Sequence, residues 1–67
     1  MEEIKDKKGK LICKGDPTTG TIESVYKGFR SSTNLPVGGS FTIEKEDTLT
    51  IITRTTAERF DVKRYES

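Results

Sequence analysis

The apolar residues of the chain fall in short bursts that are separated by turn-forming residues. Between residues 41 and 53, apolar and polar side chains alternate on either side of Glu46 and Asp47. This alternation is typical of strands with one buried face, and two polar residues between two such runs predict a hairpin. In the second strand of this hairpin, we expect Leu49 and Ile51 to face the core and the intervening threonines to face outward.

Three further segments complete the predicted strands. Residues 10–14 and 21–27 are short runs on either side of a turn rich in Pro, Thr and Gly. Residues 60–65 alternate again. A capping-box pattern, with Thr55 as N-cap and Glu58 at the third helical position, predicts one helical turn near residues 56–59 before this last strand. The alternative at this end is a single helix over residues 56–66.

The chain of 67 residues has room for one domain. Residues 1–9 are rich in charge, and we expect them to form a flexible N-terminal tail. Residues 10–67 are expected to form a single small β-barrel domain, with an irregular stretch at residues 28–40. The alternative for the N-terminus is a hairpin that pairs residues 2–6 with the following strand.

Composition favours a sheet. Thr, Val and Ile supply 19 of the 67 residues, ten of them Thr, and these residue types suit a half-buried pleated surface. Most strong helix formers other than Lys and Glu are scarce. The predicted fold class is therefore mainly β. Because a few short antiparallel strands must curl to enclose a core, we expect a small five-stranded antiparallel SH3-like barrel with one short helical turn before the last strand.

Residues 14–25 carry a local pattern. Gly20 is followed after one residue by Ile22 and after two more by Val25, which is similar to the core of the KOW motif. That motif occurs in SH3-like barrels of ribosomal and transcription-elongation proteins. The resemblance implies that the strand leaves a glycine turn and wraps a barrel, and that the preceding loop contacts RNA or protein. Residues 17–19 depart from the basic, glycine-rich segment that usually precedes this turn.

Charge and residue types exclude several classes of protein. The chain has 12 Lys and Arg against 11 Asp and Glu, so it is neither a strongly basic nucleic-acid packager nor an acidic mimic. It has no His and one Cys, which excludes a His-based triad, a His metal site and an intramolecular disulfide. We expect Cys13 to be a small core residue. We therefore expect no enzyme, no metal and no cofactor.

The chain also lacks the sequence signals of membranes and export. The sequence contains no run of about 20 apolar residues that could form a membrane-spanning helix. The first ten residues lack the apolar segment of a secretory signal. A cytoplasmic setting is therefore expected, without a membrane partner or a small-molecule substrate.

The basic residues are distributed unevenly, and the acids gather at residues 44–47. This distribution predicts one basic face, with aromatic side chains that could stack on bases. The candidate nucleic-acid-binding residues are Lys10, Lys14, Lys27, Arg30, Lys63, Arg64 and Tyr65. We therefore expect a non-catalytic binding module, an accessory or regulatory protein acting on a nucleic-acid-handling complex. The competing interpretation is that lysines on edge strands merely discourage aggregation.

The alternative function is a protein–protein interaction adaptor without nucleic-acid contact. The free edge of an open barrel, at residues 10–14 or 60–65, could receive a strand from a partner. The apolar residues Phe29, Leu35 and Val37 could form a contact patch, or they could plug the end of the barrel. Self-association through the same edge would make the protein a weak homodimer rather than a monomer. A phage or mobile element is one source that would fit such an adaptor, although no residue establishes an origin.

Overall fold

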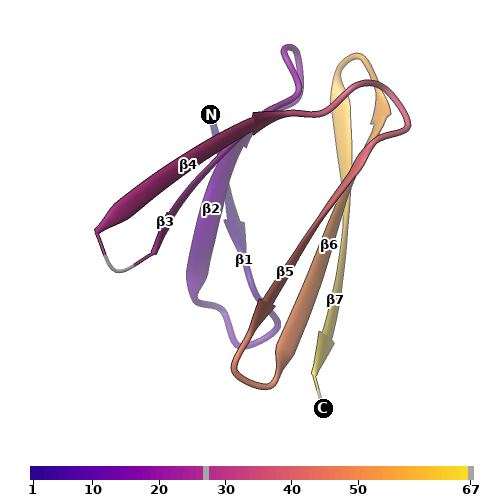
Figure 1. Cartoon of the computed structure of the whole chain (residues 1–67). Helices are drawn as coiled ribbons and strands as arrows, with labels where there is room; N and C mark the ends of the chain where they lie inside the picture. Colours follow the sequence, from indigo (N-terminus) through magenta and orange to yellow (C-terminus); the bar gives the residue numbers. More distant parts are fainter. Residues whose placement is uncertain (27, 67) are drawn as a thin grey trace.

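Over the residues that the structure describes, the chain forms seven strands in two antiparallel sheets (Figure 1). This computed structural model describes residues 1–26 and 28–66, without the side chains of Val25, Tyr26 and Phe29. The first sheet has the order β1 (Glu2–Lys5), β2 (Leu11–Asp16), β3 (Thr21–Tyr26) and β4 (Phe29–Asn34). The second sheet has the order β5 (Ser40–Lys45), β6 (Thr48–Thr56) and β7 (Arg59–Glu66). The chain passes from one sheet to the other between β4 and β5.

This architecture corrects the predicted five-stranded barrel with a helical turn. Within the described residues there is no helix, and the two sheets do not close into a barrel. The segment expected to be a helical turn contains the tight turn between β6 and β7. The Thr55 hydroxyl, the predicted N-cap, donates to the Arg59 carbonyl at 3.4 Å, and Thr56 Oγ1 accepts the N–H of Glu58 at 3.2 Å. Both hydroxyls therefore stabilise a turn of the chain instead of capping a helix.

The N-terminal residues also differ from the expectation of a flexible tail. Glu2–Lys5 form β1 and pair with β2, which is the hairpin alternative. Ile4 is 3% exposed and belongs to the core. In the following turn, Asp6 Oδ1 accepts the backbone N–H groups of Lys8 and Lys10, each at 2.9 Å.

The hairpin predicted at Glu46 and Asp47 is confirmed as β5–β6. The predicted faces of β6 were wrong, because Thr50 and Ile52 are buried whereas Leu49 and Ile51 lie partly exposed on the outer face. The two-residue turn places Phe41 opposite Ile52. Since opposed residues of antiparallel strands point to the same side, the face that buries Phe41 also buries Ile52.

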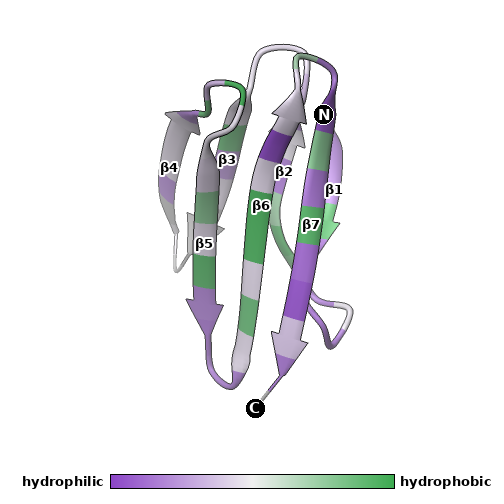
Figure 2. Ribbon diagram, turned by 90° about the vertical axis from the view of Figure 1, so that its right-hand side faces the viewer, coloured by the Kyte–Doolittle hydropathy of each residue, from purple (hydrophilic) through white to green (hydrophobic). Residues whose placement is uncertain are grey.

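The core lies between the two sheets. Its buried apolar side chains are Ile4, Ile12, Cys13, Ile22, Leu35 and Ile52, with Phe41, Ile43, Phe60 and Val62 packed against them. Figure 2 shows the second sheet in front of the first, with apolar positions recurring along β5, β6 and β7. The sheets approach closely at Gly15, where an added Cβ would lie 2.6 Å from Phe60 Cε2.

Polar contacts fasten the two sheets at opposite ends. At one end, the Arg54 guanidinium donates to the carbonyl oxygens of Pro17 at 3.1 Å and Leu35 at 2.9 Å. At the other end, Lys8 Nζ pairs with Asp47 Oδ1 at 2.6 Å. This hydrogen bond raises the pKa of Lys8 and lowers the pKa of Asp47. No helix suited to crossing a membrane occurs in the part of the chain that the structure describes.

Candidate binding site between two strands

The first sheet opens between β2 and β3. The two strands are paired from Asp16 and Thr21 as far as Lys14 and Glu23, where their register ends. Beyond this point β2 remains paired with β1, and β3 remains paired with β4 up to Tyr26. Figure 1 shows the β3–β4 hairpin projecting away from β2. Residues 11–13 therefore have a strand neighbour on one side only.

A bulge in β2 explains the opening. Ile4 pairs with Cys13 and Lys5 pairs with Leu11, so Ile12 is an extra residue with no partner on β1. A bulge bends its strand and increases the local twist, which turns this half of β2 away from β3. It also lets the neighbouring residues Ile12 and Cys13 both be buried, at 8% and 4% exposure.

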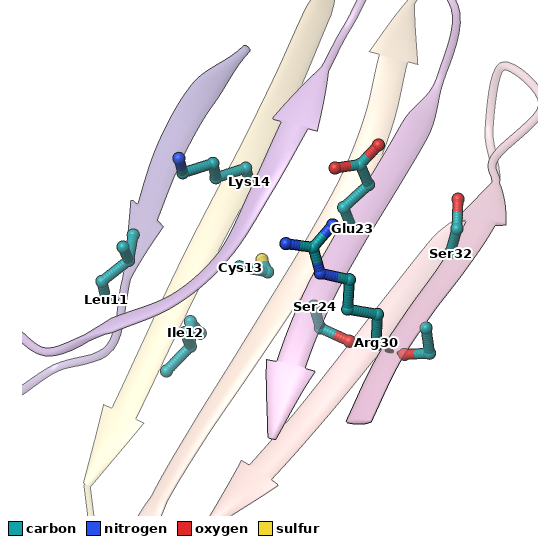
Figure 3. Close-up of a pocket in the computed structure, with 9 residues that line it drawn as sticks. Leu11, Ile12, Cys13, Lys14, Glu23, Ser24, Arg30 and Ser32 are labelled. Carbon is teal, nitrogen blue, oxygen red and sulfur yellow. Dashed lines mark hydrogen bonds between the residues drawn. The ribbon is translucent and has the colours of Figure 1, made fainter. Parts of the chain in front are cut away.

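A cavity of ≈ 370 Å³ occupies the opening. Its lining residues are Leu11, Ile12, Cys13, Lys14, Glu23, Ser24, Arg30, Ser31 and Ser32. Ser24 lies on the same side of β3 as the buried Ile22, whereas Glu23 lies on the outer side. The lining therefore includes residues from both sides of β3. Figure 3 shows Arg30 reaching from β4 across β3 towards Cys13.

The charged lining has an excess of one cation. Glu23 is opposed to Lys14 in the β2–β3 register and is a diagonal neighbour of Arg30 on the same face of the β3–β4 pair, so its charge partly screens both cations. Arg30 is exposed, and it has no ion-pair partner within the described residues. The nearby hydroxyl groups of Ser24 and Ser31 are 2.7 Å apart and share a hydrogen bond. Arg30 is thus the group best able to bind an anion here.

The remaining lining is apolar. Leu11 is 46% exposed at the cavity, and Cys13 lies deeper as part of the core. Burial raises the pKa of the Cys13 thiol to about 11, so the sulfur stays protonated at neutral pH and is a poor nucleophile. The prediction that Cys13 is a small core residue is confirmed. The described residues contain no group of three His, Cys, Asp or Glu side chains that could hold a metal ion.

The structure brings together two residues of the predicted basic face. Lys14 and Arg30 line the same cavity, whereas Lys63 and Tyr65 lie on β7 in the other sheet. Tyr65 borders a hollow of ≈ 310 Å³ that is also lined by Glu44, Glu46, Asp47 and Glu66. These carboxylates oppose the binding of a phosphate next to Tyr65.

The other residues of the predicted basic face are dispersed. Lys10 precedes β2 in the turn after β1. Arg64 Nε donates to the Lys5 carbonyl at 2.7 Å, so Arg64 connects β7 to the end of β1. Lys27 lies outside the described residues.

The apolar loop candidates have different environments. Leu35 is 7% exposed and packs in the core, whereas Val37 is 56% exposed. Phe29 begins β4, and its side chain lies outside the description. Sequence reasoning missed Leu11 and the three cavity serines. The signal for Leu11 was available, because three consecutive apolar residues at 11–13 cannot all face one side of a regular strand.

Comparison with family models, with curated proteins and with solved structures finds no match for this chain. Any function assigned to it therefore rests on the geometry of the cavity and on the chemistry of the residues that line it.

Proposed function

We propose that the protein is a non-catalytic binding module that takes up an extended peptide segment of a partner protein between β2 and β3. The observation that carries this proposal is the backbone of residues 11–13, which borders a cavity and has a strand neighbour on one side only. An extended peptide that adds to an unpaired strand edge gains main-chain hydrogen bonds. Side-chain pockets beside the edge then supply selectivity.

The lining residues define the chemistry of the segment. Leu11 and Ile12 offer apolar surface, so one side chain of the peptide should be apolar. The Arg30 guanidinium can donate two parallel hydrogen bonds to a carboxylate. The best match is therefore a short extended segment that carries an apolar residue and an acidic residue.

Modest affinity follows from the size of the site. The cavity volume of ≈ 370 Å³ lies near the lower end of the range for ligand sites, and the unpaired edge is only a few residues long. A partner held in this way is exchanged readily. This behaviour suits an accessory or regulatory protein.

A second candidate function is contact with single-stranded nucleic acid. It is favoured by Lys14 and Arg30, two cations of the predicted basic face that line one cavity. Phosphate binding of this kind would weaken steeply with added salt. Glu23 lies opposite Lys14 in the register, and its charge repels every phosphate of a strand that passes it, whereas an extended peptide carries charge at its acidic residues alone.

The two candidates can be separated by titrating isotope-labelled protein with two probes. One probe is a blocked peptide of alternating Val and Asp, and the other is a short single-stranded oligonucleotide, each at low and at moderate salt. We expect the peptide to shift the amide signals of residues 11–13 and of Ser24. Arg30→Gln should weaken peptide binding about tenfold, whereas Lys7→Gln, which removes a charge from the exposed β1–β2 turn, should change it less than twofold.

The outcomes discriminate clearly. Shifts caused only by the oligonucleotide and lost at moderate salt would favour the nucleic-acid candidate. A peptide that shifts no signal in β2 or β3 would remove the proposed peptide site. A pull-down from a native cell extract, with and without nuclease, would then identify the physiological partner.

A further inference from the structure

The free edge of β7 is the least protected edge of the two sheets. The second sheet ends at β7, whose outer side has no strand neighbour in the described structure. Figure 2 shows β7 along the border of the front sheet, with β1 behind it in the other layer. β7 has eight residues, whereas the other edge strands β1, β4 and β5 have four, six and six.

The usual structural protections of an edge are absent from β7. Edge strands are commonly shielded by shortness, by proline or by a bulge. β7 contains no Pro and no Gly, and the extra residue of the β6–β7 bulge lies on β6 at Thr55. Charged side chains remain as the only shield, so the arrangement of these charges decides what can pair with the strand.

We propose that β7 pairs antiparallel with β7 of a second copy, centred on Val62. A twofold axis perpendicular to the sheet then joins the two second sheets into one. A residue that precedes Val62 by a given number of positions then lies opposite the residue that follows Val62 by the same number in the second copy. Asp61 therefore opposes the second copy's Lys63, and Arg59 opposes the second copy's Tyr65.

Both pairs are favourable. Opposite charges across two strands attract, and a guanidinium can stack on an aromatic ring. Arg59, Asp61 and Lys63 are exposed and have no ion-pair partner among the described residues. Tyr65 is 50% exposed. The charges that shield β7 from other strands thus complement a second β7.

Neighbouring registers are unfavourable. Opposed residues of the two strands must lie on the same face of the sheet. The twofold axis must therefore pass between one residue and the same residue of the second copy, and not between two successive residues. An axis beside Asp61 would place Asp61 opposite itself and Arg59 opposite Lys63. An axis beside Lys63 would place Lys63 opposite itself. Like charges directly opposite one another destabilise a strand pair, and axes nearer the strand ends shorten the overlap.

The side chains of β7 that face the core are also compatible with a twofold axis at Val62. Val62 would lie opposite its own copy and Phe60 opposite the second copy's Arg64, and both Val62 and Phe60 are only partly buried in the single chain. The second copy would cover these side chains at the border of the core. Arg64 can remain bonded to the Lys5 carbonyl, because that contact is directed to the other sheet.

Sedimentation equilibrium from micromolar to millimolar protein tests this dimer. We expect reversible dimers in the wild-type protein. Asp61→Lys and Lys63→Asp each place like charges opposite at both symmetric positions, and each should raise the dissociation constant about tenfold or more. An equimolar mixture of the two variants should associate at least as tightly as wild type, because both pairs become attractive in the mixed dimer.

A matched control separates register from overall charge. Glu44→Lys on β5 changes the net charge as Asp61→Lys does, and it should leave the dissociation constant within about threefold. Far-ultraviolet circular dichroism confirms that each variant is folded. The double variant D61K/K63D should recover wild-type association even if one single variant is unstable. A strictly monomeric wild type at about 1 mM protein would overturn the proposal, as would single variants that associate like wild type.

Discussion

Gly20 lies where the turn after β2 meets the segment that follows β4. Its N–H donates to the Asp16 carbonyl at 2.8 Å, and its carbonyl accepts the Leu35 N–H at 2.7 Å. The residue has a φ of +78°, and an added Cβ would collide with the Leu35 carbonyl oxygen and lie 2.8 Å from Arg54 Nη1. Both the backbone conformation and the close packing therefore require glycine at this position.

Gly20→Ala should lower the free energy of unfolding by about 3 kcal/mol or more, because conformational strain and a steric clash add together. Gly9→Ala is the matched control, since Gly9 has a φ of +86° with nothing within 4 Å of an added Cβ. That variant should lose about 1 kcal/mol. Urea unfolding measures both values, and equal losses would show that packing at Gly20 contributes nothing.

At the scale of elements, the β5–β6 hairpin shows how a turn selects the buried face of a strand. β6 contains apolar residues at 49, 51 and 52, so either face could have been buried by composition alone. The two-residue turn aligns Ile43 with Thr50 and places Thr50 in the core at 1% exposure. The Thr50 hydroxyl has no hydrogen-bond partner there.

Thr50→Val should therefore stabilise the protein. Replacing an unpaired buried hydroxyl with a methyl group of similar size removes a desolvation cost of about 1 kcal/mol or more. Thermal unfolding should show a higher midpoint for this variant. Thr42→Val on β5 serves as the control because Thr42 is exposed, and its midpoint should change little. A lower midpoint for Thr50→Val would contradict the assigned face of β6.

The second instructive element is β4. Its sequence is mostly polar, and the residue pattern predicts an irregular stretch over residues 28–40. The strand is instead set by its ladder with β3, which runs from Thr21–Asn34 to Tyr26–Phe29. Backbone pairing, supplemented by side-chain hydrogen bonds such as Thr21 Oγ1 to Asn34 Oδ1 at 2.9 Å, forms a strand that hydrophobic alternation does not reveal.

At the scale of the whole molecule, Arg54 connects the ends of both sheets. It lies on β6, and its Nη2 also donates to the carbonyls of Thr18 at 3.0 Å and Ala57 at 3.3 Å. These bonds complete the contacts with Pro17 and Leu35. A lysine ammonium is compact and lacks the planar guanidinium, so it cannot reproduce this set of donors.

Arg54→Lys should lower the free energy of unfolding by about 2–3 kcal/mol, because several carbonyl acceptors lose a charged donor. Arg30→Lys is the control, because Arg30 is exposed and has no ion-pair partner among the described residues; a loss below about 0.5 kcal/mol is expected there. Urea unfolding at micromolar protein keeps both variants in the same assembly state. A loss of equal size in both would show that the Arg54 contacts are not what holds the sheet ends together.

The two proposed surfaces belong to different sheets. The cavity lies between β2 and β3, whereas the dimer edge is β7. Pairing through β7 therefore leaves both cavities of a dimer open. Two linked sites would raise the effective affinity for a partner that carries two matching segments.

The sequence by itself determined the β class, the β5–β6 hairpin and the core role of Cys13. These features depend on residues adjacent in the chain: β-branched composition, a two-residue polar turn and a small apolar side chain within a strand. The opposition of Ile52 to Phe41 could also have been deduced, because the length of the turn fixes it. The KOW-like pattern and the nucleic-acid-binding role of the basic residues stay predictions.

Only the tertiary structure decided the pairing of β1, the ladder of β4 and the separation of the sheets. Whether residues 2–5 form a strand depends on whether Ile4 finds a core, and that core includes Ile52 and Leu35 from distant segments. The cavity likewise depends on a bulge in β2 and on β3 following β4. Long-range packing and backbone pairing are set by partners far along the chain, so local alternation cannot encode them.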